Sequence, residues 1–234
     1  WKQNGGSFVV LDDVGLVSSD NKKTTFKLQN IPLTGTNEYH ATVGGDFVAY
    51  TGEGESNSSK VEIELDGTDL EVGGQVTVYG TGTNEVKLMN GSTVTVVASD
   101  TATSTPAILL SNAKVQMSND FWHWNSKNAI EATNGSIGFE HSELLDWTAG
   151  SVSAGKNLAF VDSTANLVGT SLSAENDLYV IKSRIDQTYG KIHFGNELVV
   201  RDGTVNLFGT TVQIGDNTGT DDNFILKDSA WNQY

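Results

Sequence analysis

The 234-residue sequence contains no cysteine, only two prolines and no long apolar run. The absence of cysteine excludes disulfide bonds and thiol chemistry. No apolar stretch approaches the length of about 20 residues that a membrane-spanning helix needs. Good helix-forming runs are also scarce, and the abundance of Gly, Ser, Thr, Asn and Val is typical of an all-β protein. A chain of this length can bury a substantial core as one continuous domain.

Positive charge is in short supply as well. There are 14 Lys and Arg against 29 Asp and Glu, so the formal net charge is −15. Such an anionic surface repels phosphate backbones and acidic lipids. We therefore expect no nucleic-acid partner and no membrane insertion, and we attribute the acidic residues chiefly to the solubility of a β-rich protein.

From about residue 135 the sequence repeats itself at a step of about 20 residues. Four consecutive blocks (136–155, 156–175, 176–195 and 196–215) each contain three short, mostly apolar pairs spaced i and i+2. This spacing is the period of a β-strand, and three strands per repeat predict a β-solenoid in which each repeat is one coil. The first pair recurs as Leu158/Phe160, Leu178/Val180 and Leu198/Val200.

The pattern extends in both directions. Forward, Phe224, Leu226 and Trp231 continue it if residues 216–221 form a loop. Backward, similar pairs reach Phe47/Ala49, which predicts about eight or nine coils in all.

Residues 1–46 fit the period poorly. We therefore predict a solenoid over residues 47–234, preceded by an N-terminal segment that either caps the first coil or donates a strand to another subunit. The sequence begins with Trp1 rather than Met, so we expect that a leader peptide has been removed.

Residues 152–186 carry a resemblance to a known family. The spacing Ala-x-x-x-Leu-x-apolar occurs at 154–160 and again at 174–180, each followed by a small turn. In this spacing and in its 20-residue step, the stretch 135–215 resembles the haemagglutinin repeats of filamentous haemagglutinin-type secreted proteins. The resemblance implies a right-handed parallel β-helix on a bacterial surface or in the medium, commonly serving adhesion.

One predicted strand of each coil is apolar on both faces, and its outward positions are the main candidate site. A strand of this kind is normally covered, and an exposed apolar strip marks a protein–protein contact. Either another molecule or a loop or N-terminal segment of this chain could cover it. Glu140, Arg201 and Lys227 would rim the strip, and Trp231 would add an apolar surface at the last coil. The outward residues are Ala159, Val161, Tyr179, Ile181, Val199 and Ile225.

A second set of outward positions forms a polar ladder. It contains His123, Asp146 and Asp186, with Asn166 and Asn206 at the intervening steps. A site for a glycan or a cation is one interpretation. A solvated face with stacked amide hydrogen bonds is the favoured one.

The tryptophans Trp122, Trp124 and Trp147 fall on inward columns, where Leu145 and Trp147 form one inward pair. We therefore expect them to fill the core rather than to stack on sugars. Gln187 falls in an inward column too, so its buried amide should need internal hydrogen-bond partners.

Two acidic clusters could carry chemistry. Glu140, His141, Glu143 and Asp146 could perform general acid–base catalysis. No catalytic motif surrounds them, however, and we expect no enzymatic activity. The loop containing Asp216, Asp221 and Asp222 is dense enough in oxygen ligands for calcium but lacks a known calcium-binding spacing. We expect an acidic turn there, without a metal or a cofactor.

These observations predict an extracellular or cell-surface protein of structural or adhesive function, most specifically a self-assembling filament subunit. Its expected partners are further copies of the chain or another surface protein. The alternatives are a carbohydrate-binding β-helix module and a polysaccharide-degrading enzyme.

Overall fold

The structure is a computed structural model that describes residues 2–4, 7–19, 22–29, 39–52, 59–97, 106–118, 127–148, 150–215 and 223–234. In these residues the chain is all-β and contains no helix. Its strands form two sheets, one of nine strands and one of seventeen. Within each sheet, all the described pairings of neighbouring strands are parallel. The chain therefore folds as the predicted β-solenoid.

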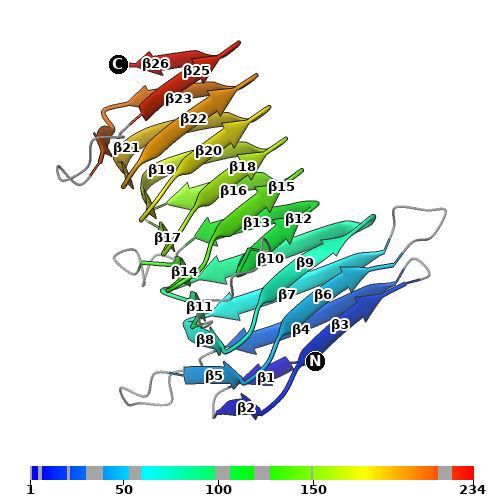
Figure 1. Cartoon of the computed structure of the whole chain (residues 1–234). Helices are drawn as coiled ribbons and strands as arrows, with labels where there is room; N and C mark the ends of the chain where they lie inside the picture. The colour runs from blue at the N-terminus through cyan, green and yellow to red at the C-terminus, as the bar shows by residue number, and fades with distance from the viewer. Residues whose placement is uncertain are drawn as a thin grey trace.

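Each coil contributes one strand to the nine-stranded sheet, which we call sheet B. The strand order along the solenoid is the chain order, so that each coil stacks on the one before it (Figure 1). The strands of sheet B are β3 (Val14–Ser18), β6 (Phe47–Thr51), β9 (Val76–Gly80), β12 (Ile108–Ser111), β15 (Ile137–Glu140), β18 (Leu158–Val161), β20 (Leu178–Ile181), β22 (Glu197–Arg201) and β25 (Asn223–Lys227).

The larger sheet bends around a corner and so supplies two rows of strands. Row A1, which follows sheet B in each coil, contains β1 (Lys2–Asn4), β4 (Lys23–Gln29), β7 (Lys60–Asp66), β10 (Thr83–Met89), β13 (Ala113–Ser118), β16 (Glu143–Thr148), β23 (Thr204–Phe208) and β26 (Ala230–Gln233). Row A2 contains β2 (Phe8–Val10), β5 (Tyr39–Val43), β8 (Thr68–Val72), β11 (Thr93–Val96), β14 (Ala129–Ala132), β17 (Ser151–Ala154) and β24 (Thr211–Ile214). The long strands β19 (Thr164–Ala174) and β21 (Arg184–Phe194) turn the corner and belong to both rows.

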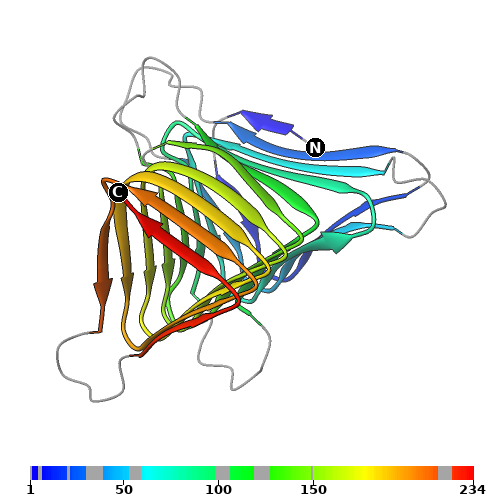
Figure 2. The same ribbon diagram turned by 90° about the horizontal axis from the view of Figure 1, so that it is seen from above.

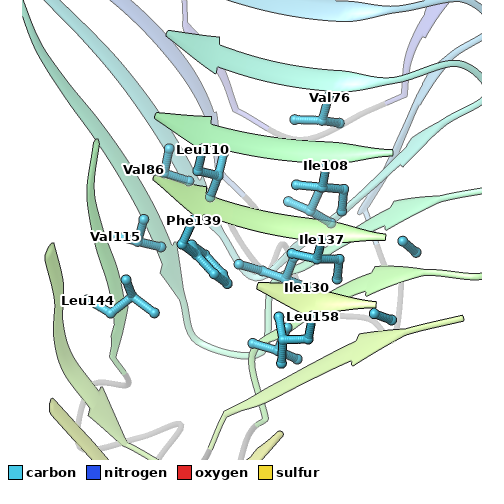
Figure 3. Packing of buried hydrophobic residues seen from close by; sticks show 14 of the residues in the cluster. Val76, Val86, Ile108, Leu110, Val115, Ile130, Ile137, Phe139, Leu144 and Leu158 are labelled. Atoms are coloured by element: carbon cyan, nitrogen blue, oxygen red, sulfur yellow. The ribbon is translucent and has the colours of Figure 1, made fainter. Parts of the chain in front are cut away.

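The three rows enclose a triangular interior. Seen along the axis, the coils turn in the right-handed sense, with sheet B on one side of the triangle and rows A1 and A2 on the other two (Figure 2). The alternate residues of each strand point inward and form one apolar core that runs from Phe26 to Leu207. Figure 3 shows its middle section, where Ile108, Ile137 and Leu158 lie one above another.

The register of the 20-residue repeat is confirmed. Leu158 aligns with Leu178, and Leu178 with Leu198, and all three side chains are buried. Toward the N-terminus the coils are longer: Phe47 aligns with Val76, and Val76 with Ile108. The extra residues fall in the longer strands of row A1 and in the connections, while the inward columns stay aligned.

The expected boundary between residues 46 and 47 does not divide the sheets. Strands β2 and β3 pair in parallel with β5 and β6, and β4 pairs with β7 over its full length. Phe26 and Leu28 of β4 belong to the common core. The described part of the N-terminal segment therefore continues the solenoid, and its long coils explain why it did not fit a 20-residue period.

One inward pair differs from the prediction. In β16 the buried residues are Leu144 and Trp147, whereas Leu145 is only half-buried. The register against β19 shifts between Leu144 and Trp147, because a β-bulge accommodates an extra residue there. The indole of Trp147 is fully buried and donates a hydrogen bond to the carbonyl oxygen of Val115 at 2.9 Å, which confirms its predicted place in the core.

The corner between sheet B and row A1 is held by a column of buried serines. Each follows a residue with positive φ, such as His141 or Asp162, that makes the sharp turn. The backbone N–H of Ser142 donates to Ser163 Oγ at 3.1 Å, and that of Ser163 donates to Ser183 Oγ at 3.0 Å. The side chains thus satisfy backbone donors that the turn removes from the sheets.

We expect Ser163→Ala to lower the free energy of unfolding by about 1–2 kcal/mol, because it leaves the buried N–H of Ser142 without its acceptor. The measurement is equilibrium denaturation in urea. Ser153→Ala is the matched control, since Ser153 is exposed on row A2 and should change stability by less than about 0.5 kcal/mol. Equal effects of the two substitutions would refute the role of the serine column.

Candidate functional site: the outer face of sheet B

The three outer faces of the solenoid differ in chemistry. Row A2 presents mainly small polar and charged side chains. Row A1 presents interleaved Lys and Glu in its first coils and Asp and Asn in its last. Sheet B alone presents a predominantly apolar outer surface. The solenoid is therefore amphipathic across its cross-section, with one side of the triangle different from the other two.

The outer side of sheet B, which we call the apolar face, carries two parallel lines of side chains. Both lines follow from the parallel register, because residues at equivalent positions stack on one another. Line B1 consists of Gly15, Val48, Thr77, Leu109, Gly138, Ala159, Tyr179, Val199 and Ile225. Line B2 consists of Val17, Tyr50, Tyr79, Ser111, Glu140, Val161, Ile181, Arg201 and Lys227.

All six residues predicted for the apolar strip lie on this face. Tyr179 stacks between Ala159 and Val199 in line B1, and Val161 stacks beneath Ile181 in line B2. Val199 is only 3% exposed, whereas Ile225 is 37% exposed. Among the described residues no strand packs on the outer side of sheet B (Figure 2). The part of the N-terminal segment that is described lies in the coils and not over the strip.

Tyr179 keeps the centre of the strip uncharged. Its hydroxyl donates a hydrogen bond to Asp177 Oδ2 at 2.8 Å. Burial, and then the hydrogen bond and negative charge of Asp177, raise the pKa of Tyr179 to about 12. The phenol therefore stays protonated at neutral pH and contributes a ring with a hydroxyl that is already satisfied within its own chain.

The sequence analysis missed the N-terminal half of the apolar face. There Tyr50 and Tyr79 stack with ring centroids 4.8 Å apart, and Tyr79 is 41% exposed. Val17 lies below Tyr50 in the same line and is 64% exposed. The signal was present, since each of these strands alternates buried and outward residues, but the irregular repeat length hid the alignment.

The predicted rim residues occupy line B2. Arg201 and Lys227 follow Ile181 at the C-terminal end of the line, and Glu140 lies at its middle, beside Val161. The apolar face thus has aromatic rings toward one end and cations at the other.

Trp231 lies away from the apolar face. It aligns with Val205 in row A1 and packs edge-on against Phe224, with ring centroids 5.1 Å apart. Both rings belong to inward columns and are partly exposed at the last coil. Trp231 is therefore a core residue of this coil.

The polar ladder on row A1 is a hydrogen-bonded stack. Asn206 donates from Nδ2 to Asp186 Oδ1 at 2.6 Å, and Asn232 donates from Nδ2 to Asn206 Oδ1 at 2.8 Å. Burial alone would raise the pKa of Asp186, but hydrogen bonds from Arg184 and Asn206 bring it below its usual value. The oxygens that would bind a ligand are therefore already engaged within the chain. His123 lies outside the described residues, as does the side chain of Asp146.

The predicted acid–base cluster is spread around the corner that follows β15. Glu140 lies on the apolar face, whereas Glu143 begins row A1 and lies 3.6 Å from Lys114 Nζ. His141 makes the turn, with its Nδ1 3.6 Å from Asp162 Oδ2. A surface hollow at this corner is lined by His141, Glu143 and Lys114 but not by Glu140. The hollow contains positively and negatively charged side chains, but it lacks the pair of converging carboxylates that acid–base catalysis would use.

Gln187 is buried in its inward column, as predicted. Its Nε2 donates to the carbonyl oxygens of Thr170 at 2.8 Å and Tyr189 at 3.2 Å. The acidic loop with Asp216, Asp221 and Asp222 lies outside the described residues. Within the described ranges, no group of three His, Asp or Glu side chains could hold a metal ion. Nor does that part of the chain contain a helix able to cross a membrane.

Comparison with protein-family models, with curated proteins and with solved structures finds no match for this chain. The class of protein that the structure defines is a parallel β-solenoid.

Row A1 differs most sharply from the apolar face at its N-terminal coils. Glu62 of β7 is 7% exposed and forms ion pairs with Lys23 of β4 and with Lys87 of β10, the latter at 2.8 Å. Burial by itself would raise the pKa of Glu62, but the hydrogen bonds and charges of these two lysines lower it to about 2. The network ties three successive coils together.

We expect Glu62→Gln to lower the free energy of unfolding at pH 7 by about 1–2 kcal/mol. Because the folded-state pKa is depressed from 4.5 to about 2, the contribution of the carboxylate is fully present above about pH 4.5. It is lost as the pH falls toward 2. Denaturation curves from pH 7 to 2 should therefore converge for the two proteins, and Glu131→Gln on exposed row A2 should show no such effect. A stability difference that is independent of pH would refute the ion-pair explanation.

Proposed function

We propose that this protein is a structural subunit, extracellular or on the cell surface, that assembles with copies of itself into filaments or adhesive layers. The first contact in this assembly is the apolar face of sheet B. The observation that carries the proposal is the contrast among the three outer faces, because only sheet B lacks a polar surface along most of its length.

The dimensions of the apolar face support an association between two such faces. Nine strands about 4.8 Å apart extend over about 38 Å, and strands of four to five residues are about 14 Å wide. Two copies in full contact would therefore bury about 1,000 Å² in total, which is at the lower limit for a specific protein–protein interface. Sheets also pack readily face to face, with side chains of both layers interdigitating.

The coil stack suits a structural task. The coils are linked by ladders of parallel hydrogen bonds that run along the axis, so that bending or stretching the rod must strain many bonds at once. The formal net charge of −15 keeps the polar faces of neighbouring rods apart. Association is thereby directed to the one face that carries little charge.

The test is the double variant Ala159→Lys/Ile181→Lys, which places two like charges on half-buried positions of the apolar face. Ser153→Lys/Ser171→Lys, on exposed positions of row A2, adds the same charge as a control. We expect the original chain and the control to form dimers or larger assemblies in sedimentation velocity at tens of micromolar, with regular particles in negative-stain electron microscopy. The apolar-face variant should have a dissociation constant at least about tenfold higher and should therefore sediment mainly as the 25.0 kDa monomer. A strictly monomeric original chain would overturn the proposal.

One observation favours carbohydrate binding as the second candidate function. Tyr189 and Phe208 form an edge-on ring pair, with centroids 6.3 Å apart, at the corner between rows A1 and A2. They are 58% and 54% exposed, so the rings offer an apolar surface to a ligand. Glycan-array binding that Phe208→Ala abolishes and Ala159→Lys/Ile181→Lys preserves would establish this function. The absence of any glycan signal for the original chain would dismiss it.

A further inference from the structure

We infer that two copies of this chain pack through their apolar faces with antiparallel long axes, related by a two-fold axis that runs along the strand direction at β15. This inference rests on the proposed function, since it specifies how the self-associating faces meet. A two-fold axis in the plane of the interface makes the contact self-complementary, so that the same surface is used by both copies.

The symmetry fixes which strands face each other. Because β15 is the fifth of the nine strands in sheet B, it lies opposite its own copy. β3 then lies opposite β25, β6 opposite β22 and β9 opposite β20. An axis along the strands also keeps line B1 over line B1 and line B2 over line B2.

At two positions of line B1 this arrangement places a small residue opposite a large one. Gly15 lies opposite Ile225, which is 37% exposed, and a Cβ atom at Gly15 would have no neighbour within 4 Å. Thr77 lies opposite Tyr179, and Gly138 lies opposite Gly138 of the other copy at the centre. The complementary volumes of the first two pairs let the sheets pack closely there, and the glycine pair lets the two backbones approach at the centre.

In line B2 the arrangement brings the cations of one copy to the aromatic rings of the other. Arg201 lies opposite Tyr50, beside Tyr79, and Lys227 lies opposite the exposed Val17. A guanidinium group stacks favourably on a tyrosine ring, and the aliphatic stem of Lys can cover an apolar neighbour while its charge stays in water.

The parallel alternative is less favourable. A two-fold axis along the rod would put each strand opposite its own copy and would exchange the two lines. Lys227 would lie on an apolar side chain in either arrangement, but Arg201 would then lie against Val199 and would lose the tyrosine ring that the antiparallel pair gives it.

The antiparallel arrangement has one unfavourable contact. Glu140 in line B2 lies opposite its own copy at the two-fold axis, and like charges facing each other across sheets are destabilising. Removing the charge should therefore strengthen the pair. We expect Glu140→Gln to lower the dissociation constant about two- to fivefold in sedimentation equilibrium. An unchanged or raised dissociation constant would contradict the proposed centre.

Because the chain contains no cysteine, the orientation can be read from engineered cysteines joined by a cross-linker. Facing sheets lie about 10 Å apart, which is too far for a direct disulfide. We would mix the single variants Val17→Cys and Lys227→Cys in equal amounts, treat them with a bismaleimide cross-linker that spans about 10 Å, and identify the linked peptides by mass spectrometry. The antiparallel pair predicts 17–227 links between copies, with few 17–17 or 227–227 links. Thr42→Cys and Gln213→Cys on row A2 are the matched control and should not link above background.

The possible results separate this inference from the proposed function. If the chain associates in sedimentation but the mixture gives 17–17 and 227–227 links, or no links, the antiparallel contact is wrong while self-assembly stands. If the original chain is monomeric and gives no links, both are wrong. Predominant 17–227 links in an associating chain would establish the antiparallel pair.

Discussion

Parallel hydrogen bonding between successive coils is the interaction on which the rest of this structure depends. It requires each strand to lie directly above its equivalent, as Leu158, Leu178 and Leu198 do. The turns between strands break the ladders, and buried side chains at the corners restore the lost bonds. The Ser163 hydroxyl accepts from the preceding turn, and Asn128 Oδ1 accepts from the N–H groups of Gly91 and Ser92 at 3.0 Å. Without these acceptors the corners would bury unsatisfied donors.

The same alignment decides the chemistry of the outer faces. A residue type that is favourable in one coil lies about 4.8 Å from its equivalent in the next, so its interactions repeat along the rod. Apolar residues at outward positions of sheet B thereby merge into one continuous face. On row A1, Asp186 and Asn206 become a hydrogen-bonded ladder, and the lysines around Glu62 become an ion-pair network. The chemistry of each face therefore comes from weak contacts that repeat from one coil to the next.

The fold was predictable from the sequence wherever the repeat length was constant. From Leu158 to Val200 alternation at i and i+2 identified the inward pairs, and the residues between them identified the C-terminal half of the apolar face. The N-terminal coils could not be aligned in this way, because their length varies while the pairing is set by hydrogen bonds between distant strands. A local pattern also does not show where a bulge absorbs a residue, which is why Leu144 rather than Leu145 fills the core.

In a solenoid with identical coils, an outer face would have the same chemistry along its whole length. The apolar face of this solenoid does not. The apolar face carries the ring pair of Tyr50 and Tyr79 toward one end and the cations Arg201 and Lys227 at the other, so its two halves differ in chemistry. A face that is uniformly apolar can slide along its partner, since each shift of one strand restores an equivalent contact. In the antiparallel pair that we propose, the different chemistry of the two ends removes that freedom, because only one register brings Arg201 to the ring of Tyr50. In such a pair, the differences between coils would supply the specificity that identical repeats lack.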